Sequence, residues 1–170
     1  LRRGVRAEFL ATGQIGIAVT GRGVPLDAIR LDYAAGAIEG LVMSVADSDL
    51  IILEGQGSLL HPGSSATLPL MRGLCPTHLI VCHRPGRDTL EMHPAVNVPP
   101  IKDFIKLCED LAEACGAFGR PRTVGVSLDT SRCDEPTARD FVKRMADESG
   151  LPATDVVRFG CANLVDALLV

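Results

Sequence analysis

Short apolar runs alternate with helical patterns along the chain, and this alternation constrains the fold more than any other sequence feature. The apolar runs cover residues 6–11, 50–53, 78–82 and 122–128, and each suits a strand buried on both faces. Aromatic residues make up only 4% of the chain, so the core consists mainly of Val, Leu, Ile and Ala, as in buried parallel strands. The sequence therefore predicts an α/β fold with a doubly wound, mostly parallel sheet and helices on both faces.

Helical patterns fill the segments between these runs. The clearest are residues 100–116, which end at Gly116, and residues 135–149, which begin after a capping Asp134. Weaker patterns predict a Gly-rich loop over 12–23, helices over 27–46, 65–74 and 161–169, and a short fifth strand over 155–157. The small residues of the 27–46 helix, among them Gly36 and Gly40, are expected to allow close approach to the sheet. Since no linker composition interrupts the pattern, residues 1–170 are predicted to form one domain.

Charge and hydropathy exclude several classes of partner. The formal net charge is −4 and only three lysines occur, which argues against a nucleic-acid surface. The longest apolar runs are far shorter than the roughly 18 residues of a bilayer span, so no membrane segment is predicted. The six cysteines form no C-x-x-C or paired zinc spacing, and we interpret them as reduced thiols in a cytoplasmic protein.

The first residues predict that further chain lies upstream. Leu1, Arg2, Arg3 and Gly4 resemble the last turn of a helix, with cations near its end and a terminating glycine. A helix needs more than one turn to form, and the sequence does not begin with Met. We therefore expect a preceding segment.

Polar residues follow all four predicted strands. They are Thr12-Gly13-Gln14 after the first, Glu54-Gly55-Gln56-Gly57-Ser58 after the second, His83-Arg84-Pro85-Gly86-Arg87 after the third, and Asp129-Thr130-Ser131 after the fourth. Ligands of open parallel sheets bind at the carboxyl ends of the strands, where these residues would share one crevice. The sequence therefore predicts a small-molecule site.

Glu54 is the most informative of these residues, because a carboxylate at the end of a buried strand needs a cation, a proton or a metal ion. Its functional interpretations are general base and magnesium ligand. The alternative is a structural carboxylate that accepts hydrogen bonds from the amides of the following Gly turn. Asp32 is likewise either a second metal carboxylate or a solvated side chain.

Two arginines and two histidines complete the predicted site. Arg84 and Arg87 flank a Pro-Gly turn, and their planar guanidinium groups suit carboxylate or phosphate ligands, although surface roles stay open. His61 and His83 each follow a strand and are candidates for acid–base or anion-binding roles, with structural roles as the alternative. Neither G-x-G-x-x-G nor G-x-x-x-x-G-K-[ST] occurs in the sequence, so no dinucleotide fingerprint is present.

Three segments taken together resemble the C-terminal domain of the DUF1611 family over essentially the whole chain. They are Ala11-Thr12-Gly13-Gln14, the run from Leu53 to Pro62 (LEGQGSLLHP), and Cys82-His83-Arg84-Pro85-Gly86-Arg87. The resemblance implies a P-loop fold of the dethiobiotin synthetase type, and an enzyme that uses acetyl-CoA to acetylate D-glutamate. It also implies that the phosphate-binding loop and an N-terminal Rossmann-like domain precede residue 1, so that this chain alone is inactive.

The resemblance also implies roles for individual residues. Glu54 or His83 would accept the proton of the substrate amine, and Arg84 and Arg87 would hold the carboxylates of glutamate. The expected binding residues are Thr12, Gln14, Gly55, Gln56, Gly57, His61, Arg84, Arg87 and Asp129. The resemblance implies Asn at this position in the family, so Asp129 is a departure from its pattern. If that loop contacts a base, hydrogen-bond donor and acceptor are partly exchanged.

Two other classes of function stay open. One is an ATP- and magnesium-dependent kinase or ligase in which Glu54 and Asp32 hold the metal ion. The other is a non-catalytic nucleotide-binding domain. The sequence leaves open the amino-acid substrate and whether the protein forms a homo-oligomer.

Overall fold

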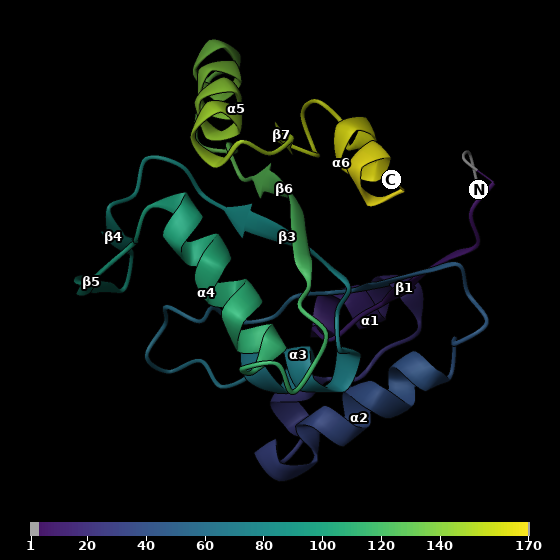
Figure 1. Cartoon of the computed structure of the whole chain (residues 1–170). Coiled ribbons are helices and arrows are strands. Elements are labelled where there is room, and N and C mark those ends of the chain that lie inside the picture. Colours follow the sequence, from purple (N-terminus) through teal and green to yellow (C-terminus); the bar gives the residue numbers. More distant parts are fainter. Residues whose placement is uncertain (1–3, 170) are drawn as a thin grey trace. The chain divides into compact units, whose positions relative to one another are not determined.

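The computed structural model describes residues 4–169 and divides into two compact units, Leu1–Cys75 and Pro76–Val170 (Figure 1). That residues 1–170 form one domain stays a prediction. The predicted helical turn at Leu1, Arg2 and Arg3 lies outside the described residues. Gly4 is described and has a φ of 72°, in the left-handed region that suits a helix-ending glycine.

The first unit contains two parallel strands and three α-helices in its described part. The elements are β1 (Ala7–Leu10), α1 (Gln14–Thr20), a 3₁₀ turn η1 (Leu26–Ala28), α2 (Leu31–Met43), β2 (Leu50–Leu53) and α3 (Thr67–Leu74). β1 pairs with β2 in parallel, from Ala7 opposite Leu50 to Leu10 opposite Leu53. The core between α2 and α3 is built from Leu26, Ala34, Ile38 and Leu70, all nearly inaccessible to solvent.

Two predictions for this unit need correction. The Gly-rich segment 12–23 is not a continuous loop, because α1 forms within it between extended Gly13 and left-handed Gly21. The helix predicted over 27–46 begins later, since Ile29 and Arg30 adopt extended backbone after η1 and the α-helix starts at Leu31.

The close helix contact also differs from the expected one. A Cβ at Gly36 or Gly40 would meet nothing within 4 Å, so these glycines do not mediate a close approach in the described structure. A Cβ at Gly73 of α3 would instead lie 2.4 Å from the carbonyl oxygen of Ala35 and 2.6 Å from the Cβ of Ile38. Gly73 therefore allows α3 to pack tightly on α2.

The second unit is built on a three-stranded parallel sheet. Its elements are β3 (His78–His83), β4 (Thr89–Leu90), β5 (His93–Asn97), α4 (Ile101–Glu113), β6 (Arg122–Leu128), α5 (Glu135–Ser149), β7 (Ala153–Thr154) and α6 (Ala162–Leu168). The strand order is β3-β6-β7, with both pairings parallel. β4 and β5 form a separate antiparallel hairpin.

Helices cover both faces of this sheet, as Figure 1 shows. Val126 and Leu128 of β6 pack in one core cluster with Ile101 of α4 and Met145 of α5. Neighbouring residues of a strand point to opposite faces, and a Cβ at Gly125 would lie 2.4 Å from Leu164 of α6. α4 and α5 therefore cover one face and α6 covers the other.

Local signals predict most of this unit well. β6 has the predicted bounds, and α5 begins after Asp134, whose side chain accepts a hydrogen bond of 3.0 Å from the Thr137 amide. The fifth strand was predicted over 155–157, but β7 is Ala153–Thr154. Residues 155–157 turn instead, because the Asp155 side chain accepts hydrogen bonds from the amides of Val157 and Arg158.

The β4–β5 hairpin was not predicted. Its first strand has two residues and its second contains Pro94, so neither has the apolar pattern of a buried strand. Among the described residues, the four predicted strands have only parallel pairings with one another. Their membership of one common sheet stays a prediction.

Among residues 4–169, no helix is both long and apolar enough to span a bilayer.

Candidate functional site

A cleft of about 510 Å³ lies at the carboxyl ends of β3, β6 and β7 in the second unit. Parallel strands end at the same edge of a sheet, so the residues after each strand contribute one wall. The cleft is lined by Cys82, His83, Arg84, Arg87, Ser127, Leu128, Asp129, Ser131, Asp155, Val156, Val157 and Arg158. Four of the predicted site residues, His83, Arg84, Arg87 and Asp129, therefore share this cleft.

Arg84 is held against Asp129 across the cleft. The strand pairing continues past His83, whose carbonyl accepts a 2.9 Å hydrogen bond from the Asp129 amide, and this aligns the two loops. Arg84 Nε donates to Asp129 Oδ2 over 2.7 Å, and Arg84 Nη2 donates to the same oxygen. Hydrogen bonds from Ser131 and from Arg84 lower the pKa of Asp129 to about 2. Asp129 is therefore ionised at neutral pH and orients the guanidinium group.

Arg87 lies beside Arg84 and pairs with a different carboxylate. Its Nη2 atom is 2.7 Å from Oε2 of Glu91, which lies between β4 and β5. Hydrogen bonds from Arg87 and Arg132 lower the pKa of Glu91. Both predicted arginines thus carry their charge at the cleft, each with an acidic partner.

His83 is the last residue of β3 rather than the first of the loop, and its side chain is half-buried. Burial lowers the pKa of His83 below its usual value near 6.5, and the charge of Glu148 opposes that shift. The imidazole is therefore neutral at neutral pH, the form that can accept a proton.

Asp155 is a cleft residue that the sequence analysis missed. Its side chain is 5% exposed and accepts hydrogen bonds from the Thr130 amide at 3.1 Å and from the Thr130 hydroxyl. It also accepts from the amides of Val157 and Arg158, both at 3.0 Å. Burial is the largest single influence on the pKa of Asp155 and raises it. The hydrogen bonds together have a larger effect in the opposite direction, so the pKa of Asp155 is lowered.

The signal that could have found Asp155 is the same strand-end rule. Placing the fifth strand two residues too late put Asp155 inside the strand instead of directly after it. Asp155 joins the loop after β6 to the loop after β7. Arg158 strengthens this connection by donating to the carbonyl oxygens of Thr130 and Cys133, at 3.1 and 2.6 Å.

Glu54 lies in the first unit, directly after β2, and its side chain is half-buried. Its Oε2 atom accepts hydrogen bonds from the amides of Thr12 at 2.8 Å and Gly13 at 2.9 Å. A Cβ at Gly16 would lie 2.7 Å from that oxygen, so glycine leaves room for the carboxylate. The predicted structural alternative is thus right about backbone amides but wrong about their source, which is the loop after β1.

The other predicted residues of the first unit divide between this loop and its surroundings. Thr12 is fully buried, and its hydroxyl donates to the Glu54 carbonyl at 3.2 Å, while Gln14 begins α1 and is exposed. Gln56 Nε2 donates to Asp27 at 2.8 Å, and Gln56 Oε1 is buried without a hydrogen-bond partner. Thr12 and Glu54 are therefore brought together.

Two glycines, one histidine and one aspartate remain among the predicted residues of the first unit. Gly57 has a φ of 75°, and a Cβ there would lie 2.1 Å from Ser64 Oγ, whereas Gly55 is exposed with open space around it. His61 Nδ1 accepts a 3.1 Å hydrogen bond from the Gly63 amide. Asp32 is exposed in the first turn of α2.

The predicted residues thus form two groups, Thr12 with Glu54 in the first unit and the cleft residues in the second. That they meet in one crevice stays a prediction. Within residues 4–169, no group of three or more His, Cys, Asp or Glu side chains is placed to hold a metal ion.

The fold defines an α/β protein, and the cleft at the carboxyl ends of its parallel strands is the candidate ligand site. The chain belongs to the DUF1611 family, since residues 1–165 match the family model described as "Domain of unknown function (DUF1611_C) P-loop domain". A crystal structure of a DUF1611 family protein from Anabaena variabilis ATCC 29413 is similar, with a TM-score of 0.96 and 49% identity. It is matched over 99% of this chain and 49% of that chain.

Two curated relatives carry the name D-glutamate N-acetyltransferase. The protein from Tritonibacter scottomollicae is 40% identical over 167 residues, which are 98% of this chain and 50% of that protein. The protein from a Pseudoalteromonas species is 32% identical over 162 residues, 95% of this chain and 48% of that protein. The chain spans about half the length of these relatives.

Proposed function

We propose that this chain is a domain of a D-glutamate N-acetyltransferase, which transfers the acetyl group of acetyl-CoA to the amine of D-glutamate. The observation that carries this proposal is the similarity to two proteins of that name over nearly the whole chain. The cleft of the second unit supports it, because Arg84 and Arg87 are suited to the carboxylates of an acidic amino acid or the phosphates of CoA.

The proposed reaction requires a neutral amine. The amine nitrogen attacks the thioester carbon, so a C–N bond forms, the C–S bond breaks and CoA leaves as a thiolate that takes up a proton. Glutamate carries an ammonium group at neutral pH, and that group must first lose a proton. A side chain that accepts the proton therefore accelerates the reaction.

Glu54 and His83 both have the chemistry for this step. Oε2 of Glu54 is engaged with two amides, and Oε1 accepts no hydrogen bond from the described residues, so it is open to a proton. His83 lies in the same cleft as Arg84 and Arg87, with a lowered pKa that leaves its imidazole neutral. The two candidates differ in the charge of the proton-accepting group, which is a carboxylate in Glu54 and a neutral imidazole in His83.

Binding of CoA would require residues beyond this chain. The resemblance to the family implies a phosphate-binding loop before residue 1, whose amides would hold the pyrophosphate of CoA. The half-length coverage of both relatives supports a longer functional protein. We therefore propose that the chain is inactive alone. Free thiols at all six cysteines support a cytoplasmic location.

The second candidate is an ATP- and magnesium-dependent kinase or ligase, or a nucleotide-binding domain without turnover. The family's description as a P-loop domain supports this second candidate, because P-loops commonly bind nucleotides. Under this alternative, Glu54 and Asp32 would hold the metal ion.

Turnover by the full-length protein separates these functions. The protein is incubated with D-glutamate and either acetyl-CoA or ATP with Mg²⁺, and thiol release, ADP formation and the N-acetylated product are measured. L-glutamate serves as the control for chirality. Thiol release matched by N-acetyl-D-glutamate is the expected result, whereas ADP formation without thiol release contradicts the acetyltransferase proposal.

A further inference from the structure

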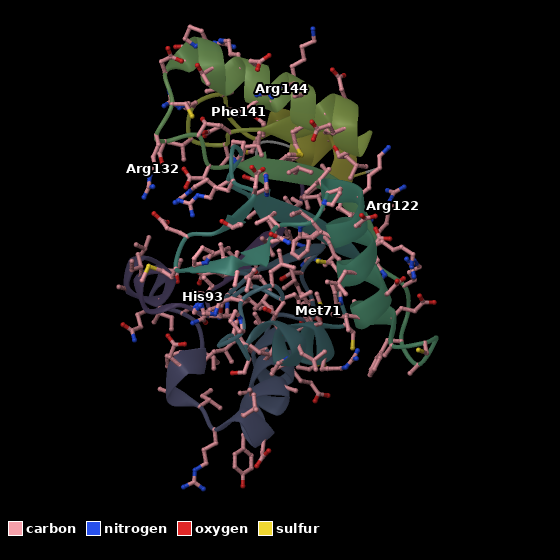
Figure 2. All side chains as sticks on the ribbon, turned by 90° about the vertical axis from the view of Figure 1, so that its left-hand side faces the viewer. Met71, His93, Arg122, Arg132, Phe141 and Arg144 are labelled. Atoms are coloured by element: carbon pink, nitrogen blue, oxygen red, sulfur yellow. The ribbon has the colours of Figure 1, made fainter. Side chains whose placement is uncertain are left out.

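Three arginine side chains surround a single carboxylate, that of Glu91, beside the cleft of the second unit. Arg87 Nη2 is 2.7 Å from Glu91 Oε2, Arg132 Nη1 is 3.2 Å from Oε1, and Arg84 Nη1 is 3.9 Å from Oε2. Arg84 and Arg87 follow β3, whereas Arg132 follows β6. Figure 2 shows the Arg132 side chain projecting from the loop that precedes α5. The arrangement is therefore created by the sheet and not by neighbouring sequence positions.

The charges of this group do not balance. Three guanidinium groups face two carboxylates, Glu91 and Asp129, so one positive charge within the group is unmatched. Arg84 is the arginine that hydrogen-bonds Asp129, whereas Arg87 and Arg132 hydrogen-bond Glu91. Carboxylate and phosphate oxygens are the ligands that such a planar cationic group binds best.

Glu91 is also easy to displace. It lies in the turn between β4 and β5, a short hairpin, and 51% of its side chain is exposed. The Arg132 side chain is 67% exposed. Ion pairs this exposed contribute little to stability, because water and salt screen them. A ligand anion that contacts all three guanidinium groups can therefore replace the Glu91 carboxylate.

We propose that Arg84, Arg87 and Arg132 form an anion-binding site at the edge of the cleft, which Glu91 fills as an internal carboxylate until a ligand anion displaces it. The inference rests on the proposed function for the identity of the anion, which is a carboxylate of the amino-acid substrate or a phosphate of CoA. Arg132 thereby becomes a ligand-binding residue, and Glu91 becomes a competitor that weakens ligand affinity.

Residue-specific arginine labelling tests this proposal on the full-length protein without measuring activity. Phenylglyoxal modifies accessible guanidinium groups, and peptide mass spectrometry quantifies the modification at Arg87 and Arg132. Inorganic phosphate, D-glutamate and CoA are each titrated as protecting anions. Protection at both arginines is expected. Protection at lower concentration by D-glutamate than by CoA assigns the site to the amino acid, and the reverse order assigns it to a phosphate.

Two variants test the role of Glu91 and Arg132. Glu91→Gln removes the competing charge, so the half-protecting concentration of phosphate at Arg87 should fall about two- to fivefold. Arg132→Met removes one donor and should raise that concentration by a similar factor. Asp140→Asn is the control, because Asp140 forms an exposed pair with Arg144 further along α5 and should leave the protection at Arg87 unchanged.

The proposal is overturned if none of the anions protects Arg87 and Arg132, or if Glu91→Gln leaves the half-protecting concentration unchanged or raises it. An unchanged value in Arg132→Met removes Arg132 from the site. Failure of this proposal can be distinguished from failure of the proposed function. Protection without acetyl transfer contradicts only the function, and acetyl transfer without protection contradicts only this site.

Discussion

Among single residues, Glu54 accepts hydrogen bonds from two backbone amides and is also a proposed proton acceptor. We expect Glu54→Gln in the full-length protein to lower turnover roughly 10²-fold while acetyl-CoA binding is retained, because the amide keeps the shape but accepts no proton. Initial rates and calorimetric CoA binding measure the two effects. Glu8→Gln is the control, since Glu8 is a β1 carboxylate paired with Arg22. Unchanged turnover in Glu54→Gln leaves Glu54 with a purely structural role.

His83 predicts a distinct pH dependence. Its pKa is lowered from 6.5, so the neutral, proton-accepting form is complete above that pH and is lost as the pH falls through the lowered pKa. If His83 is the base, kcat/KM falls on the acid side of about pH 6.5, and His83→Asn removes this limb together with most of the rate. His78→Asn, at the other end of β3, is the control. A limb that persists in His83→Asn assigns the titration to another group.

Asp155 predicts a loss of stability that depends on pH. Asp155→Asn places an amide against the Thr130, Val157 and Arg158 donors and should cost about 2–4 kcal/mol at neutral pH. The folded-state pKa of Asp155 lies below 3.8, so its stabilisation is complete above that pH and is lost as the pH falls through the folded-state pKa.

Urea unfolding at several pH values measures this effect. The difference between the wild type and Asp155→Asn should be constant near neutral pH and narrow below about pH 4. Asp140→Asn, which removes an exposed carboxylate paired with Arg144, is the control and should change stability little. A difference that does not change with pH contradicts the role of the Asp155 charge.

At the scale of secondary-structure elements, two helix glycines predict opposite effects of the same substitution. Gly73→Ala puts a Cβ 2.4 Å from the Ala35 carbonyl oxygen and should destabilise the packing of α3 on α2 by about 1–3 kcal/mol. Gly40→Ala, in α2, meets nothing within 4 Å and should stabilise the helix by about 0.5–1 kcal/mol. Thermal unfolding of both variants gives the signs, and equal signs contradict this description of the packing.

For the whole molecule, the greater length of the two relatives leads to a prediction about the activity of this chain alone. The 170-residue chain covers about half of each curated relative, and the proposed phosphate-binding loop lies outside it. We expect no thiol release from acetyl-CoA by this chain alone, and release by the full-length protein. Circular dichroism of the isolated chain shows whether it is folded during the assay. Turnover by the folded 170-residue chain at the full-length rate contradicts the proposal.

The first unit also carries exposed apolar side chains. Phe9 of β1 and Ile52 of β2 are register partners, with exposed fractions of 42% and 43%, and Ile15 and Val19 of α1 are more than 80% exposed. Soluble proteins keep such neighbouring apolar side chains mainly where another surface covers them. The sequence pattern cannot reveal this exposure, because the same apolar run describes a covered and an uncovered strand.

Several local elements could be predicted from the sequence alone, although α1 and the β4–β5 hairpin were not. The bounds of β6 and α5 followed from an apolar run and from the Asp134 cap, because periodicity and capping act over a few residues. The sequence also placed His83, Arg84, Arg87 and Asp129 at strand ends, and parallel pairing then brought them into one cleft. Local pattern and sheet topology were sufficient for this much of the site.

The pairing of individual polar groups depends on the three-dimensional fold. Glu54 binds amides 41 and 42 positions away, Arg84 pairs with an aspartate 45 positions away, and Asp155 reaches Thr130 over 25 positions. The third arginine beside Glu91 comes from 41 positions further along the chain. Hydrogen bonds and ion pairs depend on distances of about 3 Å, which no spacing in the sequence encodes once the two partners lie on different strands.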